Sequence, residues 1–122
     1  MRRGILLDWC REHGFSRLAL GHHLDDAIET FFLNLFFQRR LEPLKAATPS
    51  DSTGVVTVRP LILVEEVQIV DWLAQSGLRA IECPVCDRFP RSSRRDIGEL
   101  IDTLRQAHPE LSASVRQALY GR

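Results

Sequence analysis

The sequence has no net charge: 16 lysine and arginine residues balance 16 aspartate and glutamate residues among 122 positions. No overall positive field therefore attracts nucleic acid, and any contact with phosphate groups has to come from local clusters. Cysteine occurs only three times, and an odd number argues against a disulfide framework and predicts a cytoplasmic protein. No apolar run of membrane length and no signal-peptide pattern is present, so we expect no membrane segment.

The length and the 44% hydrophobic content are those of one globular domain, without internal repeats or low-complexity tracts. Short apolar runs predict strands at 17–20 and 55–59, with a third at 78–81, and residues 41–54 are expected to form a loop. Cys10 lies on an apolar helical stripe and is predicted to be a core residue. Helical spacing of apolar residues, together with end signals, predicts helices at about 5–13, 28–37, 65–76, 93–108 and 110–120.

Strands that alternate with helices predict an α/β fold with a parallel sheet and right-handed crossovers. Two or three strands make a thin sheet with a free edge, so we expect the isolated chain to be marginally stable or to dimerise through that edge. The predicted helix at 28–37 is apolar around too much of its circumference for a surface helix, because Leu33 and Phe37 lie outside its main stripe. Part of this helix is therefore expected to pack on a second subunit or on protein outside this chain.

The most informative segment is Gly-His-His-Leu-Asp-Asp at 21–26, which follows a predicted strand and precedes an apolar helix. Polar groups collected where the carboxyl end of a strand turns into a helix are typical of ligand sites in α/β proteins. Asp25 and Glu29 lie four residues apart on one helix face, where they repel each other mildly. A bound cation such as Mg²⁺ would remove that repulsion, so the segment predicts a ligand site.

A simpler interpretation of the same segment is a helix cap. Asp26 would be the N-cap, Glu29 would reach back to complete a capping box, and Asp25 would stabilise the helix dipole. This alternative stays open, although it gives no role to the other polar residues of the segment: Gly21, His22, His23 and Thr30.

Cys83 and Cys86 form a Cys-x-x-Cys pair, which is the spacing of a metal half-site or a redox pair. The pair supplies two of the four ligands of a closed metal site, and a purely structural or zinc-bound pair is the alternative. Basic residues also cluster, either as solvated faces or as contacts to RNA phosphates. The clusters are Arg88, Arg91, Arg94 and Arg95, and Arg39, Arg40 and Lys45.

Four segments together resemble the PP-loop ATP pyrophosphatase family. They are Gly-His-His-x-Asp-Asp-x-x-Glu-Thr at 21–30, Val-Arg-Pro-Leu at 58–61, Ile-Glu-Cys-Pro-Val-Cys at 81–86 and Arg-Arg-Gly-Ile-Leu at 2–6. The set is similar to the carboxyl-terminal half of TtcA-type tRNA 2-thiocytidine synthetases, over most of the chain up to Arg95. The resemblance implies a partial three-layer parallel sheet of the adenine nucleotide alpha hydrolase type. Residues 1–95 would be the second half of the nucleotide-binding domain and 96–122 a helical C-terminal extension.

This resemblance implies ATP-dependent thiolation of a tRNA cytidine. Asp25 and Asp26 are expected to hold Mg²⁺ and to act in catalysis. Cys83 is expected to act in sulfur transfer and to hold a 4Fe–4S cluster, with Cys86 as a second metal ligand. The expected partners are tRNA, a sulfur donor protein and a second copy of the chain. The residues expected to bind ATP are Gly21, His22, His23, Glu29, Thr30 and Arg59.

The family's phosphate-binding loop, Ser-Gly-Gly-x-Asp-Ser, and its upstream cysteine pair do not occur in this sequence. The chain is therefore expected to be a fragment or a truncated form of such an enzyme. Two other interpretations stay open. One is a PP-loop enzyme with another product, as in tRNA lysidine synthesis, against which the cysteine pair argues; the other is a non-catalytic remnant that binds a nucleotide or a partner chain.

Overall fold

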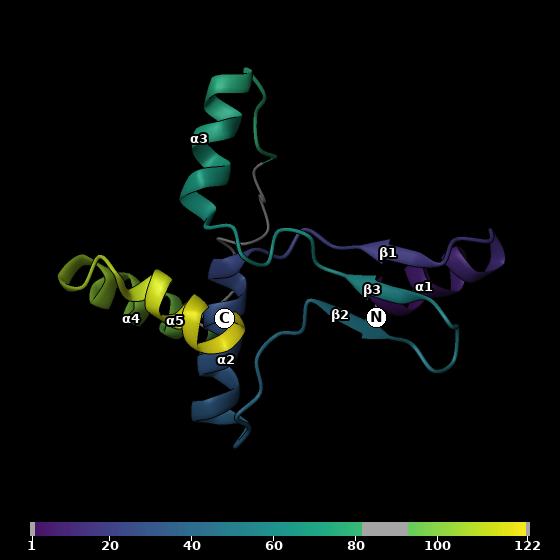
Figure 1. Ribbon diagram of the computed structural model, residues 1–122, viewed down its shortest axis with the longest axis horizontal. Coiled ribbons are helices and arrows are strands. Elements are labelled where there is room, and N and C mark those ends of the chain that lie inside the picture. The colour runs from purple at the N-terminus through teal and green to yellow at the C-terminus, as the bar shows by residue number, and fades with distance from the viewer. Residues whose placement is uncertain (1, 82–92, 122) are drawn as a thin grey trace.

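The computed structural model describes residues 2–81 and 93–121, and it confirms the predicted α/β class and the predicted helices. None of the helices in these ranges is both long and apolar enough to cross a membrane. In chain order (Figure 1) the elements are α1 (Arg2–Glu12), β1 (Arg17–Ala19), α2 (Leu24–Phe37), β2 (Ala47–Pro49), β3 (Val56–Val58), α3 (Glu66–Ser76), α4 (Ser93–Ala107) and α5 (Leu111–Tyr120).

The sheet has three strands in the order β1-β3-β2. β1 and β3 run parallel, with Leu18 opposite Thr57, whereas β2 and β3 run antiparallel, with Thr48 opposite Thr57. The prediction of a wholly parallel sheet is therefore wrong, since the sheet is mixed. The predicted loop at 41–54 contains β2, because a tight turn folds the chain directly back onto β3. Gly54 supplies the positive φ of +72° in that turn, and its N–H donates to the carbonyl of Ser50 at 2.9 Å.

The predicted strand at 78–81 is not formed. Ile81 is 98% exposed, and residues 78–81 pair with no strand in the described part of the chain. Apolar letters alone predicted this strand, whereas a strand also needs a neighbour with which to form hydrogen bonds. β2 occupies the sheet position beside β3 instead.

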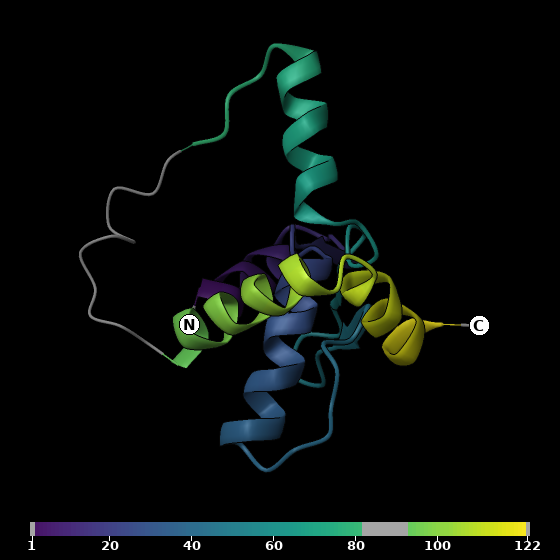
Figure 2. The same ribbon diagram turned by 90° about the vertical axis from the view of Figure 1, so that its left-hand side faces the viewer.

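The main apolar core lies where α2, α4 and α5 pack against one another (Figure 2), to one side of the sheet (Figure 1). Leu24 and Ile28 of α2 meet Ile97 and Ile101 of α4, and all four side chains are buried. This packing fixes the N-terminal turn of α2, which carries the polar segment at 21–26, against the face of α4.

The other helices are less covered. α1 contacts β1 and buries Cys10 to 6% exposure, as predicted for a core residue. α3 ends at Gly77, whose φ of +72° is the expected C-terminal signal, and it projects away from the remaining helices without burying any of its residues (Figure 1). Phe36 and Phe37 at the end of α2 are more than half exposed, so the contact of this helix with protein outside the chain stays a prediction.

Candidate functional site

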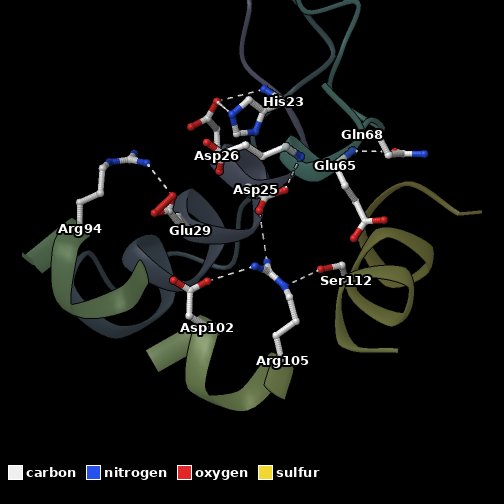
Figure 3. Close-up of polar contacts among 11 residues, drawn as sticks. His23, Asp25, Asp26, Glu29, Glu65, Gln68, Arg94, Asp102, Arg105 and Ser112 are labelled. Atoms are coloured by element: carbon white, nitrogen blue, oxygen red, sulfur yellow. Dashed lines mark hydrogen bonds and ion pairs between the residues drawn. The ribbon is translucent and has the colours of Figure 1, made fainter. Parts of the chain in front are cut away.

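The segment at 21–26 forms the turn from β1 into α2, and Asp26 stabilises the start of that helix. His23 is the N-cap, and its backbone N–H donates to the Asp26 carboxylate at 3.0 Å (Figure 3). The same carboxylate lies 3.5 Å from Nε2 of His23. The capping interpretation was therefore right about the position of the cap and wrong about its residues. His23, not Asp26, is the N-cap, Asp26 occupies the third helical position, and Glu29 faces α4.

Asp25 points to the other side of the α2 N-terminus, where it joins three further helices. One carboxylate oxygen accepts a hydrogen bond at 2.9 Å from the backbone N–H of Glu66, the first residue of α3. The other oxygen lies 3.5 Å from Nη2 of Arg105 in α4. Arg105 also donates through Nε to the hydroxyl of Ser112 in α5 at 3.0 Å, and Ser112 is only 2% exposed (Figure 3). Both oxygens of Asp25 thus face protein donors.

Arg59 follows β3 and is buried, with 5% of its surface exposed. Its Nη1 donates to the carbonyl of Lys45 at 2.8 Å, and its Nε donates to Nδ1 of His22 at 3.1 Å. This second bond assigns His22 an unprotonated Nδ1, which leaves Nε2 as the ring N–H donor. Burial lowers the pKa of Arg59 and nearby Arg3 lowers it further, while Tyr120 opposes the change; the guanidinium stays charged.

A pocket of ≈ 550 Å³ lies between these groups. Its walls come from α1, the turn before α2, α2 itself, the loop before β2, the end of β3 and α4: Arg3, His22, Asp26, Thr30, Leu44, Arg59 and Arg94. Three guanidinium groups that are far apart in sequence therefore line one cavity in a chain without net charge. Such an arrangement favours a ligand with several negative charges, above all one with phosphate groups.

α4 brings Arg94 to this pocket, and two consecutive residues of α2 hold it there. Nη2 of Arg94 donates to Oγ1 of Thr30 at 3.1 Å. Nη1 lies 4.0 Å from Oε2 of Glu29, and the guanidinium points toward that carboxylate (Figure 3). A basic residue that the sequence assigned only to an arginine cluster is therefore part of the site.

Glu29 lies in a tight and electrostatically unfavourable place. Burial is the largest cause of the raised pKa of Glu29, and the guanidinium of Arg94 opposes this rise. Gly98 of α4 lies so close that a Cβ at this position would come within 3.1 Å of Oε1 of Glu29. Other carboxylates around Glu29 raise the pKa further: Asp26, Asp25 and Glu66.

The residues of α4 that meet the start of α2 lie on one helical stripe. Positions 94, 97, 101 and 105 are separated by three or four residues, which places them on one face at about 100° per residue, and Gly98 lies next to Ile97 at the border of that face. Ile97 and Ile101 fill the centre of the stripe, and Arg94 and Arg105 lie at its two ends. One helix thus places a guanidinium group on each side of the α2 N-terminus.

A smaller pocket of ≈ 90 Å³ lies on the Asp25 side, lined by Asp25, Glu29, Glu66, Gly98, Ile101, Asp102 and Arg105. In residues 2–81 and 93–121, no three His, Cys, Asp or Glu side chains are placed to hold a metal ion. A cation at Asp26 would therefore need further ligands from a bound phosphate or from water, which is the usual way in which proteins bind Mg²⁺.

The larger pocket collects four of the residues predicted from the sequence: His22, Asp26, Thr30 and Arg59. Gly21 lies in the turn before α2, and a Cβ there would meet no protein atom within 4 Å, which leaves room for a ligand. Cys83 and Cys86 lie outside the described residues. Sequence reasoning gave Arg3 and Arg105 no individual role, since their partners are distant in the chain.

Comparison with known protein families assigns most of the chain to one family. A profile of the PP-loop domain matches residues 1–97 of the 122. The chain belongs to the PP-loop family.

The curated relatives of this PP-loop chain include tRNA-modifying enzymes. A tRNA-cytidine(32) 2-sulfurtransferase from Stenotrophomonas maltophilia (strain K279a) is 34% identical over 119 residues, covering 98% of this chain and 39% of that protein. An enzyme of the same name from Deinococcus radiodurans is 36% identical over 109 residues, covering 89% of this chain and 36% of that protein. The chain therefore spans less than half the length of these relatives.

Solved structures with a similar fold include a tRNA thiolase. It is the U34-tRNA thiolase NcsA from Methanococcus maripaludis with its 4Fe–4S cluster, which superposes with a TM-score of 0.72 at 24% sequence identity. The match covers 97% of this chain and 40% of that one. At this level of identity the likeness supports the fold that the PP-loop match indicates.

Proposed function

We propose that this chain supplies the phosphate-binding wall of an ATP site in a tRNA 2-sulfurtransferase, and that the whole enzyme thiolates a tRNA cytidine. The observation that carries the proposal is the pocket at the turn before α2, which is lined by Arg3, Arg59 and Arg94. The reaction and the substrate class come from the names of the relatives, which match this chain over nearly its whole length.

The three guanidinium groups are suited to the charge of a polyphosphate, because charged donors make short and strong hydrogen bonds to phosphate oxygens. Nη1 and Nε of Arg59 are held by Lys45 and His22, so we assign Nη2 of Arg59 to the ligand. His22 then offers Nε2–H as a neutral donor on the same side. The turn at Gly21 and the cap at His23 hold His22 just after the end of β1, and Arg59 follows the neighbouring strand β3.

The two motif aspartates take different roles in this proposal. Asp26 lines the arginine pocket, and we assign it to Mg²⁺ together with phosphate oxygens of ATP. When bound, Mg²⁺ neutralises phosphate charge during transfer. Asp25 faces Arg105 and the N-terminus of α3 instead, so we assign it to holding the site together.

We assign the sulfur chemistry to Cys83 and Cys86, as ligands of a 4Fe–4S cluster whose other thiolates lie elsewhere in the whole enzyme. The thiolase of similar fold carries such a cluster. The cysteine pair also favours thiolation over lysidine synthesis. Further parts of the proposal are a sulfur donor protein, a cytoplasmic location and a homodimer that forms through the edge of β1, which has one strand neighbour in the described sheet.

The experiment is a calorimetric titration of the 122-residue chain with ATP and with AMP, both in the presence of Mg²⁺. Because the pocket is built for phosphate groups, ATP is expected to bind about tenfold or more tightly than AMP. Arg3→Gln should weaken ATP binding by about threefold to tenfold without affecting the core, because Arg3 is exposed. Arg17→Gln is the matched control, since this arginine lies in β1 and does not line the pocket.

Equal affinities for ATP and AMP, or equal losses in the two variants, would refute the phosphate pocket. The reaction itself is tested in the whole enzyme that contains this chain, by measuring 2-thiocytidine in tRNA by mass spectrometry. Asp26→Asn is expected to abolish the modification, and normal levels of 2-thiocytidine would rule out the assigned role of Asp26.

A further inference from the structure

We infer that Glu29 is a positioning residue that holds Arg94 at the phosphate pocket, so that this carboxylate strengthens the binding of an anion. The inference deepens the proposed function and rests on it, because it takes the larger pocket to be a phosphate site. It changes the role of Glu29 from a cofactor ligand to a residue that acts through Arg94.

The two pockets separate Glu29 from the ligand. Thr30 and Arg94 line the larger pocket, whereas Glu29 lines the smaller pocket on an adjacent face of α2. The Glu29 carboxylate lies 4.0 Å from the Arg94 guanidinium (Figure 3). Thr30 accepts a hydrogen bond from the same guanidinium at 3.1 Å. The Glu29 carboxylate therefore reaches the larger pocket only through Arg94.

Glu29 is the more buried and more constrained member of the pair, whereas Arg94 is exposed enough to need a partner that holds it. The side chain of Glu29 is 25% exposed, and the close approach of Gly98 limits the space around its carboxylate. The side chain of Arg94 is 50% exposed, and an arginine in such a place samples many rotamers unless a partner holds it. An anchored guanidinium loses less conformational freedom when a phosphate binds.

The charge of Glu29 alone and its contact with Arg94 have opposite effects on anion affinity, which allows a decisive test. The charged groups around Glu29 are Asp25 and Asp26 on α2, Glu66 on α3, and Arg94 on α4; Asp102 and Arg105 on α4 also line its pocket. If Glu29 acted only through its negative charge, its removal would reduce repulsion and strengthen the binding of an anion. If Glu29 positions Arg94, its removal weakens binding.

The test is a calorimetric titration of the 122-residue chain with inorganic pyrophosphate. Glu29→Ala is expected to weaken binding about fivefold, and Glu29→Gln, which keeps an oxygen acceptor for Arg94, should remain within about twofold of the original chain. In an Arg94→Gln background, Glu29→Ala should no longer weaken binding, because the residue through which it acts is gone.

Tighter binding in Glu29→Ala, or the same change with and without Arg94, would overturn the inference while leaving the phosphate pocket in place. No pyrophosphate binding by the unsubstituted chain would overturn the inference and the proposed pocket together. If Glu29→Ala does not fold, Glu29→Asp provides the same cycle, because aspartate keeps the negative charge and withdraws the carboxylate from Arg94. Glu29→Asp is then expected to weaken binding about threefold, and only when Arg94 is present.

Discussion

Substitutions at the two adjacent aspartates are expected to separate stability from ligand binding. Asp25 accepts a hydrogen bond from the N-terminus of α3 and pairs with Arg105 of α4, whereas Asp26 lines the arginine pocket. Asp25→Ala should therefore loosen the packing of the helices and leave the phosphate-binding groups in place. Asp26→Asn should do little to the helices and remove the carboxylate that we assign to Mg²⁺.

The contacts of Asp25 set the size of the stability effect. A hydrogen bond to a charged group contributes about 1.5–3 kcal/mol, and a carboxylate in the first turn of a helix adds about 0.3–1 kcal/mol. The pair with Arg105 is long at 3.5 Å, with 28% and 17% of the two side chains exposed, so its contribution belongs at the lower end. We expect Asp25→Ala to lower the free energy of unfolding by about 2 kcal/mol. Asp25→Asn keeps an acceptor for Glu66 and should lower it by about 1 kcal/mol.

Urea unfolding followed by circular dichroism measures the first effect, and titration with ATP at several Mg²⁺ concentrations measures the second. Asp26→Asn should lose the dependence of ATP affinity on Mg²⁺, with a stability loss below about 1 kcal/mol. Arg105→Met is the matched control, because it removes the partner of Asp25 without touching the motif, and its stability loss should be at least that of Asp25→Asn, since it also removes the donor to Ser112. If Asp25→Asn lost the Mg²⁺ dependence and Asp26→Asn kept it, the assignment of the two carboxylates would be reversed.

Three further outcomes follow from the same contacts. Gly98→Ala places a Cβ 3.1 Å from Oε1 of Glu29, so the Glu29 carboxylate has to shift. The gain of about 1 kcal/mol in helix propensity offsets this cost, and the melting temperature should change little. Pyrophosphate binding should weaken about twofold, because Arg94 shifts with Glu29. Burial raises the pKa of Glu29 in the folded chain, so ionisation of Glu29 destabilises the fold. The unsubstituted chain should therefore gain stability relative to Glu29→Gln as the pH falls from neutrality toward 4.5. Urea unfolding of both proteins at several pH values measures this difference in stability, and a difference that does not change with pH would contradict the prediction. Ser16 and Leu20 form the backbone hydrogen bonds to β3, so the N–H of Ala19 points to the free edge of β1. Ala19→Pro removes this N–H and should shift a dimer that forms through β1 toward monomer in sedimentation equilibrium. An unchanged dimer would place the interface elsewhere.

Local patterns in the sequence predicted the elements but not every partner. Periodicity and end signals located the helices, because a helix depends mainly on its own residues. β2 was missed, since Ala47–Pro49 has little strand character and becomes a strand only because the turn at Gly54 folds it onto β3. The opposite error at 78–81 has the same origin, because an apolar segment without a neighbouring strand has no partner for its backbone.

The candidate site was predictable as a place and not as a set of contacts. The segment at 21–26 marked the turn before α2, and the resemblance to the PP-loop family named the downstream Arg59 with it. In the structure, both lie at the carboxyl ends of neighbouring parallel strands. Asp25 contacts α3 whereas Asp26 lines the arginine pocket, and this difference depends on which helix faces each carboxylate. That information lies in the packing of α3 and α4, which the segment at 21–26 does not encode.

α4 is the element through which that packing acts, and its sequence carried a signal that a search for stripes would have found. Arg94 and Arg105 are 11 residues apart, which is close to three full helical turns, so they share a face with Ile97 and Ile101 between them. A stripe with an apolar centre and an arginine at each end is complementary to an apolar partner flanked by carboxylates or hydroxyls. The first turns of α2 offer that partner, with Asp25 at one end and Glu29 at the other. The same docking that buries the core therefore positions Arg94 at the proposed phosphate pocket and pairs Asp25 with Arg105 outside that pocket.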